Sequence, residues 1–316
     1  MNKYKSTRKV FLPFLFLLFT FSIILSCNSQ YKREKVVEYF RVTGHLLNAC
    51  HYVPDKITHK GVVIIFEAEG GDMSLSLAKR GYEVLSVYYF GQENLPYECV
   101  EIPLEFFGEV LKYINTKCKK KKPITVIGGS KDAELAAVLV SYYPEIDNIV
   151  LYAPVSYVYQ GYTAKNKSSW AWKGEPLPFI PLSPEAQLKA EFKYAVDIKS
   201  YYRVSRPVYE EAIRLASEET RKKAEIDISN FKGHCLIFAG ADDCTWPSDT
   251  AAKALQAQNP ERVQLHIFEK AGHGFTFNYV YFYFWKLGGT PEGNYKASIE
   301  HKKILYKFLD KQHPKK

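Results

Sequence analysis

A serine, an aspartate and a histidine in this sequence have surroundings that are typical of nucleophilic catalysis. Ser130 follows two glycines, Asp243 lies three residues after a glycine, and His273 lies between two glycines. An imidazole that accepts the hydroxyl proton turns serine into a nucleophile, and a carboxylate orients that imidazole and stabilises its charged form. We therefore predict that Ser130 attacks an acyl carbonyl, with His273 as its base and Asp243 as the orienting acid.

The segment around Ser130 has the pattern of a strand, a tight turn and a helix. Residues 124–127 are all β-branched, and apolar residues recur at helical spacing over residues 135–139. This arrangement is that of the nucleophile elbow, G-x-S-x-G, in which a strained turn holds the hydroxyl above a parallel sheet. Gly128 fills the first glycine position. Asp132 stands at the second, and we expect its carboxylate, in the first turn of the helix, to face free backbone N–H groups or solvent.

Asp243 and His273 each follow a predicted strand, at residues 235–238 and 263–268. The C-terminal ends of parallel strands form one rim of an open α/β sheet, where active sites are built. Taken singly, the aspartates before Trp246 resemble a helix cap, and the histidine resembles an ordinary turn residue. Their joint occurrence after a nucleophile elbow, in the order serine, acid, histidine, predicts a triad. The usual spacing from the glycine selects the second of the two aspartates, Asp243.

The oxyanion of an acyl-transfer reaction needs two backbone N–H donors. We expect one from Lys131, directly after the nucleophile, and one from the turn after the predicted strand at residues 61–66, where Glu69 or Gly70 is the donor. Aromatic residues near the histidine and between residues 154 and 233 predict an apolar acyl pocket. The residues assigned to this pocket are Trp170, Trp172, Trp246, Phe275 and Phe277.

Strand and helix patterns alternate along most of the chain, which predicts an α/β fold with a mostly parallel central sheet flanked by helices. Two antiparallel entry strands are predicted at residues 36–47 and 49–53. Further strands are predicted at residues 61–66, 83–88, 124–127, 149–152, 235–238 and 263–268, and helices at residues 73–79, 104–115 and 295–309.

Residues 155–232 interrupt this alternation. They show no strand pattern and contain one charged helix, at residues 208–223. A separate domain would need a core of its own, so we expect a lid inserted into a catalytic domain that spans residues 61–312. Residues 28–60 are then a linker followed by the entry strands.

The first 27 residues have the features of a bacterial lipoprotein signal. Four basic residues precede an apolar run over residues 10–25, which is shorter than the roughly 20 apolar residues of a spanning helix. The run ends in Ile24-Leu25-Ser26-Cys27, which resembles a lipobox. We expect Cys27 to be lipidated and the protein to be a membrane-anchored lipoprotein that faces the periplasm. An uncleaved signal anchor is the alternative.

The charge and cysteine content narrow the possible partners. Removing the four basic residues before Cys27 lowers the formal net charge from +9 to +5, which gives no argument for a nucleic-acid partner. The other five cysteines show no metal-ligand spacing, and an odd number cannot all pair within one chain. We therefore expect mostly free cysteines, no metal and no cofactor. A lysine cluster at residues 117–122 precedes the elbow strand, and we expect it at the opposite rim from Ser130.

From about Gly61 onward, the chain resembles the C-terminal catalytic domain shared by acyl-CoA thioesterases and bile acid-CoA:amino acid N-acyltransferase. The stretches that carry the resemblance are residues 128–135, residues 240–243 with Trp246 and Ser248, residues 271–273, and Gly288-Gly289. The resemblance implies an α/β-hydrolase fold with Ser130, Asp243 and His273 as the triad. It also implies a serine hydrolase of the acyl-CoA thioesterase or carboxylesterase type, acting on a small acyl ester or thioester.

Two alternatives to hydrolysis remain. The first is acyl transfer to an amine. In the resembled family the amino-acid-conjugating member has cysteine at the elbow, so Ser130 favours water as the acceptor. The second is a non-catalytic binding module on a hydrolase fold. The departure from the elbow motif at Asp132 favours this alternative, and the complete triad argues against it.

Overall fold

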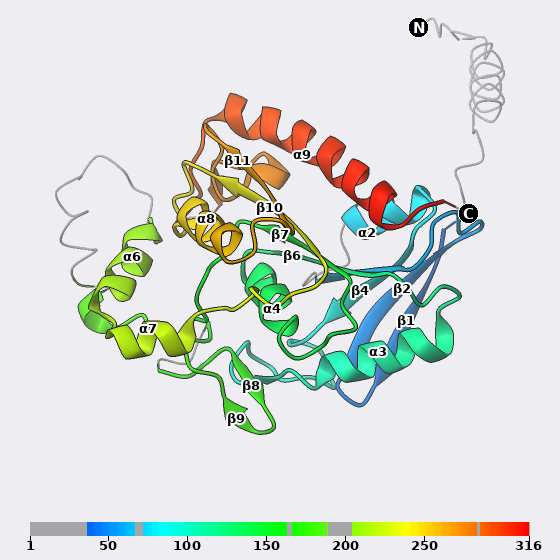
Figure 1. The fold of residues 1–316 in the computed structure, drawn as a ribbon, viewed down its shortest axis with the longest axis horizontal. Helices are drawn as coiled ribbons and strands as arrows, with labels where there is room; N and C mark the ends of the chain where they lie inside the picture. Colours follow the sequence, from blue (N-terminus) through cyan, green and yellow to red (C-terminus); the bar gives the residue numbers. More distant parts are fainter. Residues whose placement is uncertain are drawn as a thin grey trace, which may run out of the picture. The chain divides into compact units, whose positions relative to one another are not determined.

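An eight-stranded sheet forms the centre of the computed structural model of this chain (Figure 1). The structure describes residues 37–66, 72–162, 166–186, 188, 204–282 and 285–315. The predicted signal with Cys27, the predicted oxyanion donors Glu69 and Gly70, and residues 189–203 of the predicted lid therefore lie outside the described residues. From Val37 onward the chain forms one compact unit.

The order of the strands in the central sheet is β1-β2-β4-β3-β6-β7-β10-β11. The strands are β1 (Val37–Gly44), β2 (Leu47–Pro54), β3 (Val62–Phe66), β4 (Glu83–Tyr88), β6 (Ile124–Gly129), β7 (Asn148–Tyr152), β10 (His234–Gly240) and β11 (Val263–Phe268). β2 pairs antiparallel with β1 and with β4, and all later pairs are parallel. The predicted entry strands and the mostly parallel sheet are confirmed.

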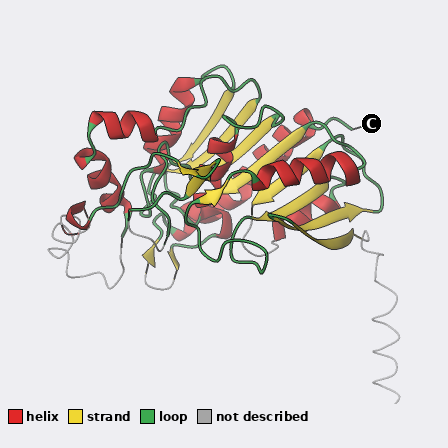
Figure 2. Cartoon of the chain, turned by 90° about the horizontal axis from the view of Figure 1, so that it is seen from below, coloured by secondary structure: helices red, strands yellow, loops and turns green. Residues whose placement is uncertain are grey.

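Side chains of the parallel strands alternate between two apolar layers, which is why these strands read as continuous hydrophobic runs. In β3, Val62 and Ile64 belong to one layer, and Val63 and Ile65 belong to the other. Helices α3 (Phe106–Lys117), α4 (Lys131–Leu139) and α8 (Ser248–Gln258) contribute to the first layer. Helices α2 (Asp72–Lys79) and α9 (Pro291–Gln312) contribute to the second, so helices cover both faces of the sheet (Figure 2).

The last helix, α9, begins earlier than the apolar spacing predicts. Its N-cap is Thr290, whose hydroxyl accepts a hydrogen bond from the Gly293 N–H at 3.0 Å, and Pro291 is its first residue. A capping threonine followed by proline is a common helix start, because the cap satisfies an N–H without an intrahelical partner and proline has none to satisfy. This start places Asn294 inside the first turns of α9.

The segment between β7 and β10 differs from the prediction in two respects. It contains short strands, since β8 (Trp170–Trp172) pairs with β5 (Ile102–Pro103) and with β9 (Glu175–Pro176). The single charged helix is in fact two helices. These are α6 (Arg206–Leu215) and α7 (Glu218–Ala224). The helix is interrupted there because Ser217 caps α7. The Ser217 hydroxyl accepts a hydrogen bond from the Thr220 N–H at 3.0 Å.

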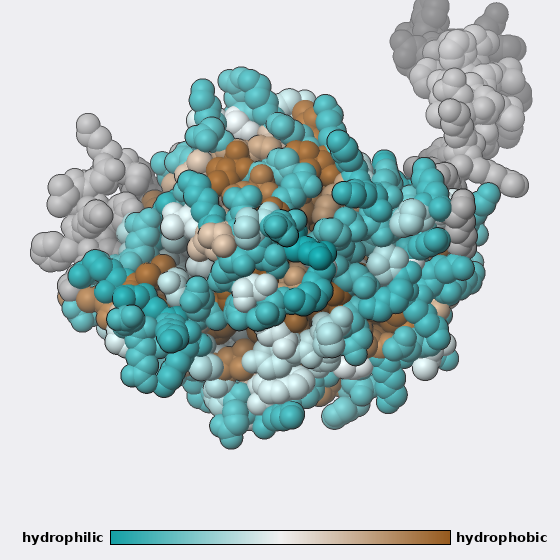
Figure 3. Space-filling model, viewed as in Figure 1, coloured by the Kyte–Doolittle hydropathy of each residue, from teal (hydrophilic) through white to brown (hydrophobic). Residues whose placement is uncertain are grey.

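Short elements follow the last strand of the sheet. These are the 3₁₀ turn η1 (Phe275–Phe277) and the strands β12 (Tyr281–Phe282) and β13 (Trp285–Lys286). Among the described residues, no helix is both long and apolar enough to cross a bilayer. The face of the molecule drawn in Figure 3 is mainly hydrophilic, with hydrophobic residues in separate patches.

Candidate active site

Ser130, His273 and Asp243 form one continuous hydrogen-bonded series. The Ser130 Oγ lies 2.9 Å from His273 Nε2, and His273 Nδ1 lies 2.9 Å from Asp243 Oδ2. A carboxylate can only accept here, so Nδ1 carries the imidazole proton and Nε2 is free to accept the serine proton. The carboxylate is fully buried and the imidazole is 12% exposed, so one edge of the base is open to solvent.

The backbone at Ser130 has the strained geometry of an elbow. The residue lies between β6 and α4 with φ +59° and ψ −120°, a region that non-glycine residues rarely adopt. Its N–H donates to the Tyr152 carbonyl at 2.8 Å, which ties the turn to β7. A Cβ at Gly128 would lie 2.1 Å from the Asp132 carbonyl oxygen. The turn can therefore form only because Gly128 has no side chain.

The Asp243 carboxylate is oriented by four donors. Its Oδ1 accepts the backbone N–H groups of Thr245 and Trp246, at 2.8 and 3.3 Å. Its Oδ2 accepts the Ser248 hydroxyl at 2.6 Å in addition to the imidazole. Asp242 is exposed, and its carboxylate accepts the Gly289 N–H at 3.0 Å instead. The carboxylate that faces His273 is therefore the second of the two aspartates.

The loops that carry the acid and the base are joined through the segment before α9. The Leu287 carbonyl accepts hydrogen bonds from the N–H groups of His273 and Cys244, at 2.8 and 3.2 Å. The fully buried Asn294 accepts the Gly272 N–H through Oδ1 at 2.9 Å and donates through Nδ2 to the Gly288 carbonyl at 3.2 Å. The position of the imidazole therefore depends on α9 as well as on the β11 loop.

Lys131 is the first residue of α4, where the first N–H groups have no intrahelical partner. Its N–H is one of the two predicted oxyanion donors. The Lys131 side chain is buried, and its Nζ lies 2.7 Å from Glu134 Oε2. Glu134 Oε1 accepts the Trp170 indole N–H at 2.8 Å and the Tyr159 N–H at 3.2 Å. Burial raises the pKa of Glu134, although Lys131 acts in the opposite direction. The ion pair lies within α4, and the Glu134 carboxylate ties this helix to the segment after β7.

Asp132 has a partner that the sequence did not reveal. The hydroxyl of Tyr89, directly after β4, donates to Asp132 Oδ1 at 2.6 Å. Burial, and next the Asp132 charge, hold the pKa of Tyr89 well above its usual range, so the phenol remains a donor. The prediction that this carboxylate faces only backbone N–H groups or solvent is therefore incomplete.

The five aromatic residues assigned to the acyl pocket are not gathered in one place. Trp246 packs edge-on against the His273 ring, with centroids 5.0 Å apart. Trp170 and Phe275 are fully buried core residues, whereas Phe277 is 73% exposed. Trp172 packs against Tyr142 and Tyr143 instead. Of the five, Trp246 is the residue with a direct ring contact to the described triad.

Three residues that hold this site in place received no role from the sequence: Ser248, Asn294 and Tyr89. The sequence does carry a signal for Ser248, because a hydroxyl side chain a few positions after an acidic residue at a helix start can hydrogen-bond back to that residue. Asn294 and Tyr89 are brought to the site by elements distant in the sequence. No local pattern could have indicated them.

Residues 102–312, more than half of the chain, match the protein family described as BAAT / Acyl-CoA thioester hydrolase C terminal. Acyl-coenzyme A thioesterase 5 from Mus musculus is 27% identical over 271 residues, covering 79% of this chain and 59% of that protein. Acyl-coenzyme A thioesterase 1 from Homo sapiens is 24% identical over 300 residues, covering 88% and 65%. The chain thus spans less than two thirds of the length of these relatives.

Solved structures share the fold at low sequence identity. An α/β hydrolase from a Medee basin deep-sea metagenome library superposes with a TM-score of 0.50 at 14% identity, covering 88% of this chain and 98% of that one. The esterase of Pyrobaculum calidifontis gives a TM-score of 0.50 at 15% identity, with 96% of both chains covered. The predicted α/β-hydrolase fold is confirmed.

Proposed function

Because the chain belongs to the BAAT / acyl-CoA thioester hydrolase C-terminal family and is an α/β hydrolase of the thioesterase and esterase type, we propose that it hydrolyses a small acyl thioester or ester through an acyl-Ser130 intermediate. The observation that carries the proposal is the hydrogen-bonded series from Ser130 through His273 to Asp243, on an elbow with a strained backbone at Ser130. A merely structural serine would not need that strained backbone.

In the proposed acylation, Ser130 Oγ attacks the acyl carbonyl carbon as His273 Nε2 takes its proton. Asp243 stabilises the imidazolium that forms. The Lys131 N–H and a second N–H from the turn after β3 hold the oxyanion of the tetrahedral intermediate. The carbon–sulfur or carbon–oxygen bond then breaks, and the leaving thiolate or alkoxide takes the proton from His273.

Water completes the proposed cycle. His273 Nε2 removes a proton from a water molecule, which attacks the acyl-Ser130 carbonyl, and collapse of the second tetrahedral intermediate returns that proton to Ser130 Oγ as the carboxylic acid leaves. The serine at the elbow supports hydrolysis over transfer to an amine, because an oxygen ester is less reactive toward amines than a thioester.

The location and the leaving group form a separate part of the proposal. The lipobox-like Cys27 supports export and anchoring to a membrane through lipid. Acyl-CoA is not expected to be plentiful in a periplasm, whereas the family supports acyl-CoA chemistry. An activity screen across p-nitrophenyl esters, acyl-CoAs and aminoacyl thioesters decides between these leaving groups.

A fluorophosphonate probe tests the proposed nucleophile directly. We expect one probe per chain, located on Ser130 by peptide mass, and no labelling of Ser130→Ala. Ser141→Ala is the matched control, since Ser141 is exposed at the end of the nucleophile helix and its hydroxyl donates to the Asp227 carbonyl. Absence of labelling in the folded wild type would overturn the serine-hydrolase proposal.

A further inference from the structure

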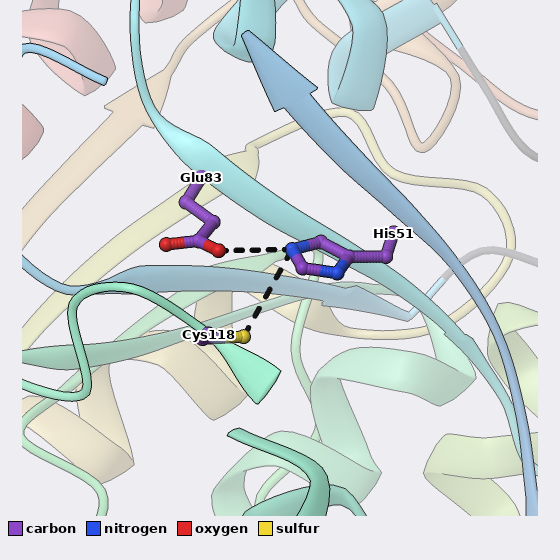
Figure 4. A group of neighbouring side chains, drawn as sticks. All are labelled: His51, Glu83 and Cys118. Carbon is purple, nitrogen blue, oxygen red and sulfur yellow. Dashed lines mark hydrogen bonds and ion pairs between the residues drawn. The ribbon is translucent and has the colours of Figure 1, made fainter. Parts of the chain in front are cut away.

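A second cluster of reactive side chains lies away from the triad. His51 of β2, Glu83 at the start of β4 and Cys118 at the end of α3 point toward one another (Figure 4). His51 Nε2 lies 3.1 Å from Glu83 Oε1 and 3.9 Å from Cys118 Sγ. All three ligand atoms lie within 4.8 Å of one another, and all three residues are buried.

This cluster lies at the opposite rim of the sheet from Ser130. Glu83 is the first residue of β4, whereas Ser130 follows the last residue of β6, and both strands are parallel to β3 between them. A strand of six residues at about 3.3 Å per residue separates the two rims by roughly 20 Å. The proposed hydrolysis therefore makes no use of these side chains.

The contacts of the imidazole distinguish a metal site from a second catalytic triad. In a triad, the nucleophile and the acid contact different ring nitrogens of the histidine. Here Glu83 and Cys118 both approach Nε2, and the other nitrogen, Nδ1, lies 3.0 Å from the Tyr113 hydroxyl. The carboxylate, the thiol and the imidazole therefore surround one point in space, as ligands of a single ion do.

The outer contacts are those that hold metal ligands in position. When Nδ1 donates to the Tyr113 oxygen, the Nε2 lone pair is directed at the centre of the cluster. Glu83 Oε2 accepts the backbone N–H groups of Lys119 and Lys120, at 3.2 and 3.4 Å. Glu83 Oε1 shares the Lys119 N–H, at 3.3 Å, and also faces His51 Nε2 at 3.1 Å. Tyr113 thus orients His51, the N–H groups after α3 orient Glu83, and Cys118 is held by its position at the end of α3.

The charges of the cluster match a divalent cation. The Cys118 thiol, the Glu83 carboxylate and the His51 imidazole are all buried. A bound dication favours the thiolate, and the thiol proton passes to solvent. One thiolate, one carboxylate and a neutral imidazole then cancel two positive charges, which removes the cost of burying a net charge.

We propose that His51 Nε2, Glu83 Oε1 and Cys118 Sγ bind one Zn²⁺ ion, which joins β2, β4 and the end of α3. Nitrogen, oxygen and sulfur ligands at about 2.0–2.3 Å in a tetrahedron are those of zinc in proteins, and water completes the fourth position. Bonds of that length place ligand atoms about 3.3–3.7 Å apart, so the 3.9 Å distance between His51 Nε2 and Cys118 Sγ shortens slightly on binding. This site is separate from the proposed active site.

Metal titration of the full chain tests this site. The chain is stripped with a chelator under reducing conditions and titrated with Co²⁺, whose thiolate complexes absorb in the near ultraviolet. We expect one equivalent to give the thiolate-to-cobalt band, and Zn²⁺ to displace it. Cys118→Ser loses the band, whereas the buried Cys235→Ser and the partly exposed Cys244→Ser keep it. A band that survives in a folded Cys118→Ser variant, or no binding by the wild type, overturns the proposal.

Two further measurements do not depend on removing a ligand. Tyr113→Phe leaves the three ligands in place but removes the partner of Nδ1, and we expect Zn²⁺ affinity to fall about 10–100-fold. Free Zn²⁺ at one hundred times its Kd raises the Tm of the wild type by on the order of 5 °C. Ester hydrolysis per folded molecule stays unchanged. An unchanged Tm, or an unchanged affinity in Tyr113→Phe, overturns the site while leaving the hydrolase proposal untouched.

Discussion

The hydroxyl of Tyr89 donates a 2.6 Å hydrogen bond to Asp132, two residues after the elbow serine. Tyr89 follows the end of β4, and Asp132 lies in the first turn of α4. The pair therefore joins the elbow to a strand two positions away in the sheet. Asp132 stands where the elbow motif has glycine, and the buried phenol gives its carboxylate a defined partner.

This relationship predicts coupled effects on stability. Tyr89→Phe removes the donor but keeps the ring, and we expect a loss of about 1–2 kcal/mol in the free energy of unfolding. In an Asp132→Ala background Tyr89→Phe costs less stability, since the acceptor of the tyrosine hydroxyl is already gone. Urea unfolding of the two single variants and the double variant measures the coupling, expected at about 0.5–2 kcal/mol. Additive effects would show that the bond contributes nothing.

The two neighbouring aspartates are expected to differ sharply in their effect on activity. Asp243→Asn places an amide beside His273 Nδ1 and favours the wrong tautomer, so we expect kcat to fall by on the order of 10³–10⁴ with the fold intact. Asp242→Asn removes only the charge of an exposed acceptor of the Gly289 N–H and is expected to cost less than about tenfold. Equal effects would contradict the assignment of the acid.

Ser248 is expected to act by positioning Asp243. Its hydroxyl donates at 2.6 Å to the same oxygen that accepts the imidazole, and hydrogen bonds to charged groups contribute about 1.5–3 kcal/mol. Ser248→Ala should lower kcat about 10–100-fold and leave KM nearly unchanged, whereas Ser248→Thr restores part of the rate. A changed KM with an unchanged kcat would instead place Ser248 in substrate binding.

Acid is expected to destabilise the fold through two buried histidines. Burial lowers the pKa of His301 and of His313 to about 4, from an ordinary value near 6.5. Between these two pH values the unfolded chain binds protons that the folded chain does not, so stability is complete above pH 6.5 and falls as the pH drops toward 4. Each histidine contributes a slope of up to about 1.4 kcal/mol per pH unit.

Urea unfolding at several pH values between 4.5 and 7.5 measures this slope. His301→Gln or His313→Gln should each reduce the pH dependence of the free energy of unfolding by the share of about one bound proton. His45→Gln is the control, because His45 lies exposed in the turn between β1 and β2. A slope that does not change in either buried-histidine variant would contradict the assignment.

The proposed lipid anchor is tested at Cys27. Acyl chains on this residue supply the membrane affinity, so Cys27→Ser should move the protein from the detergent phase to the aqueous phase on phase partitioning. Mass spectrometry of the N-terminus then distinguishes the two predictions made from the sequence. Membrane retention with residues 1–26 still attached would favour a signal anchor.

The strands of the central sheet and the positions of Ser130, Asp243 and His273 beside them were accessible from the sequence because both depend on local patterns. Runs of β-branched and apolar residues indicated the strands, and Ser130, Asp243 and His273 each follow such a run and lie next to a glycine or a few residues after one. The strand ends of a parallel sheet meet at one rim, so residues in these positions meet there. The break between α6 and α7 was missed because helical spacing continues across Ser217, whose capping role depends on the turn conformation.

Contacts across the sheet were decided by the tertiary structure alone. Tyr89 meets Asp132 across 43 residues of sequence, and His51 meets Cys118 across 67. These pairings follow from the strand order β1-β2-β4-β3-β6, which no local period encodes. The zinc ligands that we propose show no spacing pattern in the sequence for the same reason. A ligand set drawn from three separate elements exists only once nonlocal pairing has brought their ends together.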